Sequence, residues 1–149
     1  MKVALSVKTA EQNSGQSIEV LVLLVRDLAD KNYPFLYVDD LATKARAILR
    51  IRGLRVIPII DDQKRLVGVI SRTNVMAITS SISPLRVRGI MANPKFVGSI
   101  DMPAFDALRE MIRSGEWCVP VTKSSQDLSY VGMLDLSVFI RYFLKQSSS

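Results

Sequence analysis

Apolar and polar positions follow one another along this chain in an order that occurs twice. Residues 53–60 read GLRVIPII and residues 115–122 read GEWCVPVT, so that a glycine and a proline return 62 positions later. Further on, Val67-Gly68 is answered by Val131-Gly132 at an offset of 64, which places two extra residues in the turn of the second copy. A long fixed period of this kind indicates an internal duplication.

The apolar spacing predicts the same elements in both copies. Short runs of β-branched, aromatic or wholly apolar residues are typical of buried strands, and apolar residues three and four apart predict amphipathic helices. In the first copy we expect strands at 33–38, 56–60 and 66–70, a helix between Asp40 and Gly53, and a helix at 72–79. In the second copy we expect strands at 96–100, 118–121 and 130–134, with helices at 103–113 and 136–144.

The start of the chain lies outside this repeat. Apolar residues at helical spacing predict a helix at 18–28, with Ser17 as its N-cap. Residues 1–17 read as an edge strand or a loose arm. The expected organisation is an N-terminal arm and helix at 1–24, a first repeat at 25–80, a linker at 81–86, a second repeat at 87–145 and a disordered tail at 146–149.

Length and composition limit the kind of protein. A repeat of this size would be marginally stable alone, so the two copies should share one core. The 48% hydrophobic content of the 149 residues indicates apolar surface that a second copy covers, which predicts a homodimer. No apolar run approaches the ~20 residues of a membrane span. One cysteine, Cys118, excludes an internal disulfide and favours a cytoplasmic location.

Charge and chemistry narrow the function further. The net charge is +6, and the basic excess between Lys44 and Arg65 favours phosphate, on a nucleotide or on nucleic acid. The alternative is an ordinary solvated helix face. The chain has no histidine and no second thiol, so it offers few groups for proton transfer or nucleophilic attack. We therefore expect a protein that is not an enzyme and requires no cofactor or metal.

The order of elements and motifs resembles the CBS domain, named after cystathionine β-synthase. Its most specific piece here is VGVISRTNV at residues 67–75, and the resemblance covers about residues 25–144. The resemblance implies an α+β fold in which two β-α-β-β-α repeats pack sheet to sheet with pseudo-two-fold symmetry. It also implies two clefts that commonly bind adenosine-containing ligands, each cleft shared between the repeats, and a disc-shaped dimer.

The first cleft is the expected nucleotide site. A carboxylate at a helix start accepts hydrogen bonds from both hydroxyls of a ribose, but Asn74 replaces the usual aspartate and can accept through one oxygen only. Arg55 matches a position where basic residues meet phosphate in similar proteins, although a solvated arginine is the alternative. The expected nucleotide-binding residues are Arg55, Val56, Ile57, Pro58, Ser71, Arg72, Asn74, Lys95 and Phe96.

The second cleft is expected to bind more weakly. Asp135 takes the serine position, where it reads as a plain N-cap that would repel phosphate, and Val138 takes the position of the diol acceptor. Trp117 could stack on a base or serve as a core or dimer contact, and Cys118 reads as a small buried hydrophobe rather than a reactive thiol. The residues expected in this cleft are Lys31, Asn32, Trp117, Cys118 and Asp135.

The sequence thus predicts a non-catalytic regulatory module that binds AMP, ADP or ATP, with S-adenosylmethionine ranked below these. The ligand would change the conformation and so signal to an effector protein whose identity the sequence does not give. The alternative is a ligand-free dimerisation module whose basic face docks nucleic acid, at most weakly, or an acidic protein.

Overall fold

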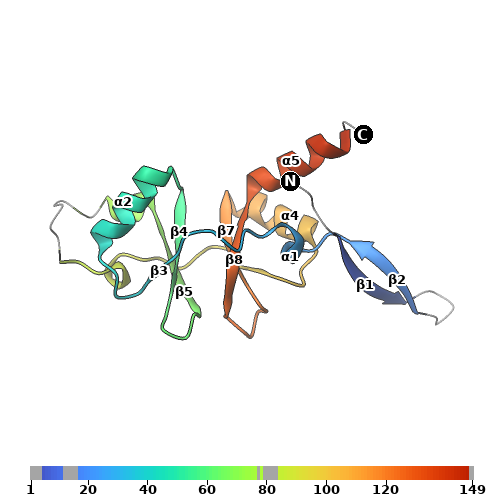
Figure 1. Cartoon of the computed structure of the whole chain (residues 1–149), viewed down its shortest axis with the longest axis horizontal. Coiled ribbons are helices and arrows are strands. Elements are labelled where there is room, and N and C mark those ends of the chain that lie inside the picture. The colour runs from blue at the N-terminus through green and yellow to red at the C-terminus, as the bar shows by residue number, and fades with distance from the viewer. Residues whose placement is uncertain (1–4, 12–16, 77, 79–83, 148–149) are drawn as a thin grey trace.

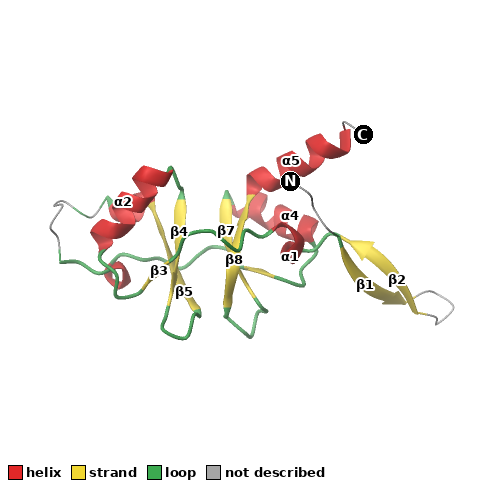
Figure 2. Cartoon of the chain, viewed as in Figure 1, coloured by secondary structure: helices red, strands yellow, loops and turns green. Residues whose placement is uncertain are grey.

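The computed structural model describes residues 5–11, 17–76, 78 and 84–147, with the backbone alone for 8–11 and 17–21. Two three-stranded sheets, ordered β3-β4-β5 and β6-β7-β8, lie side by side in the middle of the molecule (Figures 1 and 2). Helix α2 covers the outer face of the first sheet, and helices α4 and α5 cover the outer face of the second. This is the predicted α+β architecture of two repeats packed sheet to sheet.

The element bounds repeat between the two halves. The first repeat contains β3 (Leu36–Tyr37), α2 (Ala42–Arg52), β4 (Val56–Ile60), β5 (Leu66–Ser71) and α3 (Arg72–Val75). The second contains the 3-10 turn η1 (Val87–Gly89), β6 (Gly98–Ser99), α4 (Ala104–Ser114), β7 (Cys118–Thr122), β8 (Tyr130–Asp135) and α5 (Leu136–Ser147). The strands before α2 and α4 and the helix α3 are shorter than the predicted ranges.

Strand pairing and polar contacts follow the pseudo-two-fold symmetry. In each repeat the central strand pairs in parallel with the first strand and antiparallel with the last one. Helices α2 and α4 both end at a left-handed glycine, Gly53 (φ 63°) and Gly115 (φ 74°), a conformation that glycine adopts without strain. The ion pair between Arg26 and Asp101 has its counterpart in the pair between Arg88 and Asp39, 62 positions away in each partner.

The segment before each repeat packs into the other half. Helix α1 (Val25–Leu28) lies in the core of the second repeat, against α4, β7 and α5, and its Val25 N–H donates to the Met102 carbonyl at 2.9 Å. Val87, its counterpart, is buried in the core of the first repeat and donates to the Asp40 carbonyl at 2.9 Å. Because each half completes the other, the two repeats form one structural unit.

Between the sheets lies a smaller core, built from Val56, Cys118 and Met133. The two hairpin tips also pair: Leu66 N–H donates to the Leu128 carbonyl at 2.9 Å, and Tyr130 N–H donates to the Lys64 carbonyl at 3.0 Å. The sheets are therefore joined by side chains at their centre and by backbone hydrogen bonds at one end.

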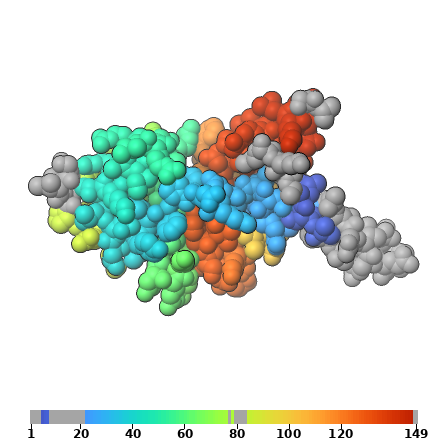
Figure 3. Space-filling model, in the orientation of Figure 1, coloured from blue at the N-terminus to red at the C-terminus, as the bar shows by residue number. Residues whose placement is uncertain are grey.

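Two sequence predictions about the ends of the chain are wrong. Residues 17–22 form strand β2 (Ser17–Val22) and not the start of a helix, and β2 pairs antiparallel with β1 (Ser6–Glu11). The β-branched residues of β2 and a partner strand outweigh the helical spacing of its apolar positions. This hairpin projects from one end of the molecule (Figure 1), and the two repeats beside it pack as one body (Figure 3). At the C-terminal end of the chain α5 runs to Ser147, so Gln146 and Ser147 are helical and the predicted disorder there is wrong; 148–149 lie outside the described residues.

In the part of the chain that the structure describes, no helix is long and apolar enough to cross a membrane.

Candidate functional site

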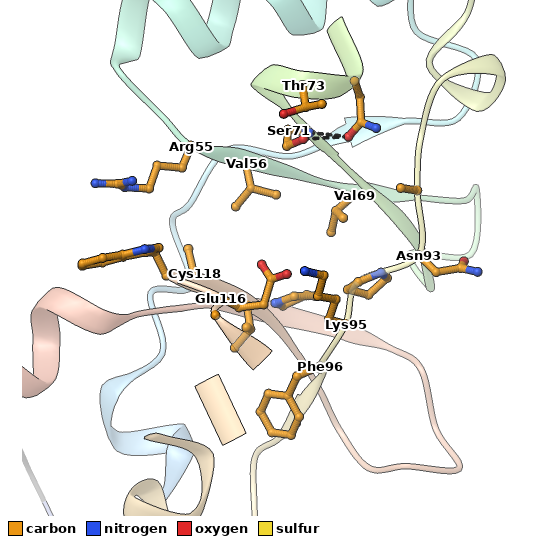
Figure 4. A pocket seen from close by; sticks show the side chains of 17 residues that line it. Arg55, Val56, Val69, Ser71, Thr73, Asn93, Lys95, Phe96, Glu116 and Cys118 are labelled. Atoms are coloured by element: carbon orange, nitrogen blue, oxygen red, sulfur yellow. Dashed lines mark hydrogen bonds between the residues drawn. The ribbon is translucent and has the colours of Figure 1, made fainter. Parts of the chain in front are cut away.

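A cleft of about 590 Å³ opens between the two repeats and is here called the first cleft. Its upper wall in Figure 4 comes from β4, β5 and the start of α3, and its lower wall from the segment before β6 and the loop that enters β7. The walls combine apolar side chains, Val56, Val69 and Phe96, with the basic side chains of Arg55 and Lys95. Such a mixture suits a flat apolar ring that carries an anionic group.

Most residues predicted for this cleft do meet there. Its lining includes Arg55, Val56, Ser71, Asn74, Lys95 and Phe96. Ile57 and Pro58 are buried within β4 and do not line it. Arg72 also lies outside it: its Nε donates to the Leu54 carbonyl at 3.0 Å, and its side chain lines shallow pockets beside Gly53 and along α2.

Trp117 and Cys118 line the first cleft, whereas the sequence placed them in the second. The reason is the symmetry axis, which brings the starts of the two central strands, β4 and β7, to the same cleft. There the Arg55 guanidinium lies over the Trp117 ring, 4.9 Å from its centroid. A cation–π contact of this kind joins the two repeats at the cleft mouth.

Asn74 is oriented by Ser71. The Ser71 N–H donates to Asn74 Oδ1 at 2.8 Å, and the Ser71 hydroxyl lies 2.9 Å from the same oxygen (dashed in Figure 4). A backbone N–H can only donate, so the amide oxygen must face Ser71 and the amide NH₂ must face elsewhere. Asn74 therefore acts as part of a helix cap.

Glu116 is a cleft residue that the sequence did not single out. It precedes Trp117 in the loop before β7, and its half-buried side chain points into the cavity from the lower wall in Figure 4. Its counterpart 62 positions earlier is Leu54, which has no polar side chain. A comparison of the two copies for charge differences, rather than for identities, would have found it.

The second cleft has the same volume, about 590 Å³, but different chemistry. It contains Lys31, Asn32 and Asp135 as predicted, together with Asp30 and Arg141, which the sequence reasoning missed. Asp135 Oδ1 accepts from the Ser137 N–H at 2.8 Å, so it caps α5 as expected.

Tyr33 marks the clearest difference between the clefts. It lines the second cleft, and its hydroxyl donates to the Val56 carbonyl at 2.7 Å. The corresponding residue of the first cleft is Lys95, whose side chain is exposed. The second cleft thus has an aromatic ring of the chain itself, hydrogen-bonded to the start of β4, where the first cleft has the exposed cation of Lys95.

Cys118 lies between the clefts and is 4% exposed. Burial, with a further contribution from Asp135, raises the pKa of its thiol to about 12. Burial likewise raises the pKa of Tyr33 above its ordinary value. A thiol held neutral in this way is a poor nucleophile, as the sequence suggested. No group of three or more potential metal ligands occurs among the described residues.

Comparisons with known proteins agree with this geometry. The CBS domain family matches residues 25–80. No curated protein matches the chain. Among solved structures, protein MJ1004 from Methanocaldococcus jannaschii is 22% identical with a TM-score of 0.73; the match covers 83% of this chain and 60% of that one.

Two further structures contain ligands. CBSX2 in complex with AMP is 21% identical, with a TM-score of 0.71 and coverage of 83% of this chain and 98% of that chain. The CBS domain pair of protein MJ0100, in complex with 5′-methylthioadenosine and S-adenosyl-L-methionine, is 21% identical, with a TM-score of 0.67 and coverage of 84% and 98%. At such identities these likenesses establish the fold. The family match in the first repeat and the same fold in the second therefore give the chain the fold of a CBS domain pair.

Proposed function

We propose that this protein is a regulatory module that binds AMP, ADP or ATP in its first cleft and signals through a change in conformation. The observation that carries the proposal is the composition of that cleft, where Arg55 and Lys95 flank apolar walls contributed by both repeats. The AMP complex of CBSX2 and the S-adenosyl-L-methionine complex of MJ0100, which share the fold, support an adenosine ligand.

In this proposal the adenine ring lies against Val56, Val69 and Phe96, and the phosphates meet Arg55 and Lys95. Charge-assisted hydrogen bonds to phosphate are about twice as strong as neutral ones, which ranks nucleotides above adenosine and above S-adenosylmethionine. Helix α3 contributes little, because its four residues make a weak dipole.

Signalling would follow from the position of the cleft. A ligand that contacts β4 and the β7 entry loop together must bind best to one arrangement of the two repeats, and it shifts the population towards that arrangement. The Arg55–Trp117 contact crosses the same boundary, so an anion that draws Arg55 away would loosen it. An effector protein would read the change.

One titration tests the proposal. Trp117 is the single tryptophan of the chain and lines the first cleft, so its fluorescence reports that cleft, while calorimetry reports every site. We expect AMP, ADP or ATP to change the fluorescence and to give one site per chain by both methods. A calorimetric site without a fluorescence change would place the ligand elsewhere, and no binding of any adenosine compound would reject the function.

We further propose that the protein is not an enzyme, that it requires no cofactor and that it works in the cytoplasm with Cys118 reduced.

We also propose that the protein is a homodimer. Helices α4 and α5 expose apolar side chains that one chain leaves uncovered, among them Phe105, Ile112, Ile140, Phe143 and Leu144. Light scattering at micromolar concentration should give twice the 16.6 kDa chain mass.

One observation favours the alternative, a ligand-free module with a basic docking face. Arg46, Arg50 and Arg72 surround a pocket of about 360 Å³ floored by Leu49 and Val75, and the described residues offer these arginines no carboxylate within ion-pair distance. Fluorescence anisotropy with labelled oligonucleotides and an acidic peptide tests it. Weak binding that fades steeply with salt is expected; sequence-selective binding that persists at high salt would place this function first.

A further inference from the structure

Glu116 is the one carboxylate among the described residues that line the first cleft. Its side chain points into the cavity (Figure 4), and none of the ion pairs in the described part of the chain includes it. A half-buried carboxylate in a cleft that also holds Arg55 and Lys95 is available to a ligand rather than committed to the fold.

Asn74 cannot supply the acceptor that a sugar requires. Its only oxygen already faces the N–H and the hydroxyl of Ser71, at 2.8 and 2.9 Å. What remains is an NH₂ group, which donates and does not accept. A vicinal diol that offers two O–H donors would find no free acceptor at this position.

We propose that Glu116 takes over this role and accepts from the hydroxyls of the ribose, so that the sugar is read by the second repeat and not by the helix start of the first. A carboxylate has two oxygens and about four acceptor positions, enough for both hydroxyls. The inference rests on the proposed adenosine ligand and names the residue that selects its sugar.

The second repeat would then contribute both the sugar contact, through Glu116, and part of the phosphate contact, through Lys95. The first repeat would contribute Arg55 and the apolar wall at Val56 and Val69. Every ligand bound in this manner bridges the two repeats, because its sugar contacts the second repeat and its phosphate contacts both.

Nucleosides carry no phosphate, so their binding reports the sugar contact without the repulsion between a phosphate and the Glu116 carboxylate. Adenosine, 2′-deoxyadenosine and 3′-deoxyadenosine would be titrated against the full chain, with Trp117 fluorescence and calorimetry as readouts. We expect adenosine to bind about ten-fold more tightly than either deoxynucleoside, the effect of one hydrogen bond to a charged acceptor. Glu116→Gln and Glu116→Ala should remove most of this ratio, and Asn74→Ala should preserve it.

Glu110→Gln is the matched control, because Glu110 lies in the same repeat on α4, pairs with Arg113 and does not line the cleft. It should keep the wild-type ratio. A ratio that survives in both Glu116 variants, or disappears in Asn74→Ala alone, would overturn the inference. So would a Glu116→Gln protein that merely binds AMP more tightly with the nucleoside ratio unchanged. A wild type that binds no adenosine compound rejects the proposed function itself.

Discussion

The two clefts of this molecule have the same arrangement of backbone around them and the same volume, but their walls can bind different groups. The first has Arg55 and Lys95 at its mouth, an Asn74 committed to the helix cap and, among the described residues of its wall, one carboxylate outside any ion pair. The second has the capping Asp135 and the inward Tyr33 at the equivalent places. Duplication therefore preserved the framework, and substitution at a few wall positions gave one cleft basic groups that suit an anionic ligand and gave the other an aromatic ring of the chain itself.

The comparison also shows where the framework tolerates no change. Strands β5 and β8 each contain a glycine where the segment from the other half crosses, and there paired backbone hydrogen bonds join Val69 to Ala92 and Asp30 to Met133, at 2.7 to 3.1 Å. These crossings fix the floor of each cleft. The side chains around them can vary, but the close approach of the two backbones cannot.

Gly132→Ala should therefore have the largest effect on stability. A Cβ at Gly132 would lie 2.4 Å from the Asp30 carbonyl oxygen, whereas one at Gly68 would lie 3.0 Å from the flexible Met91 sulfur and 3.1 Å from the Ala92 oxygen. Overpacking of this kind costs roughly 1–3 kcal/mol, and we expect Gly132→Ala at or above the top of that range and Gly68→Ala near the bottom. Urea unfolding measures both, and equal losses would contradict the difference between the crossings.

Arg55→Ala should have the largest effect on binding. Loss of a charge-assisted hydrogen bond costs roughly 1.5–3 kcal/mol, so AMP and ATP should bind about ten-fold more weakly or worse, while adenosine changes little. Calorimetry is the appropriate measurement, because the substitution itself alters the surroundings of Trp117. Arg52→Ala is the control: it removes an exposed arginine just before Gly53, outside the cleft. Equal binding by wild type and Arg55→Ala would place the phosphate elsewhere.

Cys118 predicts an effect of thiol ionisation on stability that its counterpart in the first repeat, Val56, cannot have. The native pKa of the thiol is raised to about 12, whereas the unfolded thiol ionises near its ordinary value of 9.0. Below pH 9 both states keep the proton and the thiol adds no pH dependence. Above it the unfolded state alone loses the proton, so stability should fall by about 1.4 kcal/mol per pH unit.

Urea unfolding between pH 8 and pH 10 measures this slope. Cys118→Val places the first repeat's residue in the second and removes the thiol, so its curve should be flatter over this interval. Identical slopes in the two proteins would show that the thiol is not protected as the structure indicates.

The sequence predicted the fold in detail because its strongest signals are local and repeated. The two αL glycines and the wholly apolar β4 and β7 determine their elements without reference to the rest of the chain. Residues 17–22 were predicted wrongly because their apolar spacing fits a helix and a strand alike, and only the partner β1 decides between them.

The walls of the clefts were harder to predict, because they depend on which repeat contributes each residue. Trp117 was placed in the wrong cleft because the symmetry axis brings the starts of β4 and β7 to one side. The commitment of Asn74 to Ser71 depends on a side-chain orientation that residue identity alone does not give. Glu116 was missed because the repeat is recognised from residues that are identical in both copies, and Glu116 has no identical counterpart: the corresponding residue is Leu54.

Tyr33→Phe should have the smallest effect and bears most directly on the comparison of the clefts. The Tyr33 hydroxyl donates to the Val56 carbonyl at 2.7 Å, and Val56 is 9% exposed, so the substitution leaves a nearly buried acceptor without this partner. The expected loss is about 1 kcal/mol in the free energy of unfolding. Tyr37→Phe is the control, since Tyr37 is 42% exposed in the same repeat and should change stability by less than about 0.5 kcal/mol.

If the hydroxyl holds the ring in the second cleft and fixes the start of β4, Tyr33→Phe should also weaken AMP binding slightly in the first cleft, where Val56 is part of the wall. Two variants of equal stability would mean that this hydrogen bond does not hold the Tyr33 ring in the second cleft, and the difference between the clefts would then rest on charge alone.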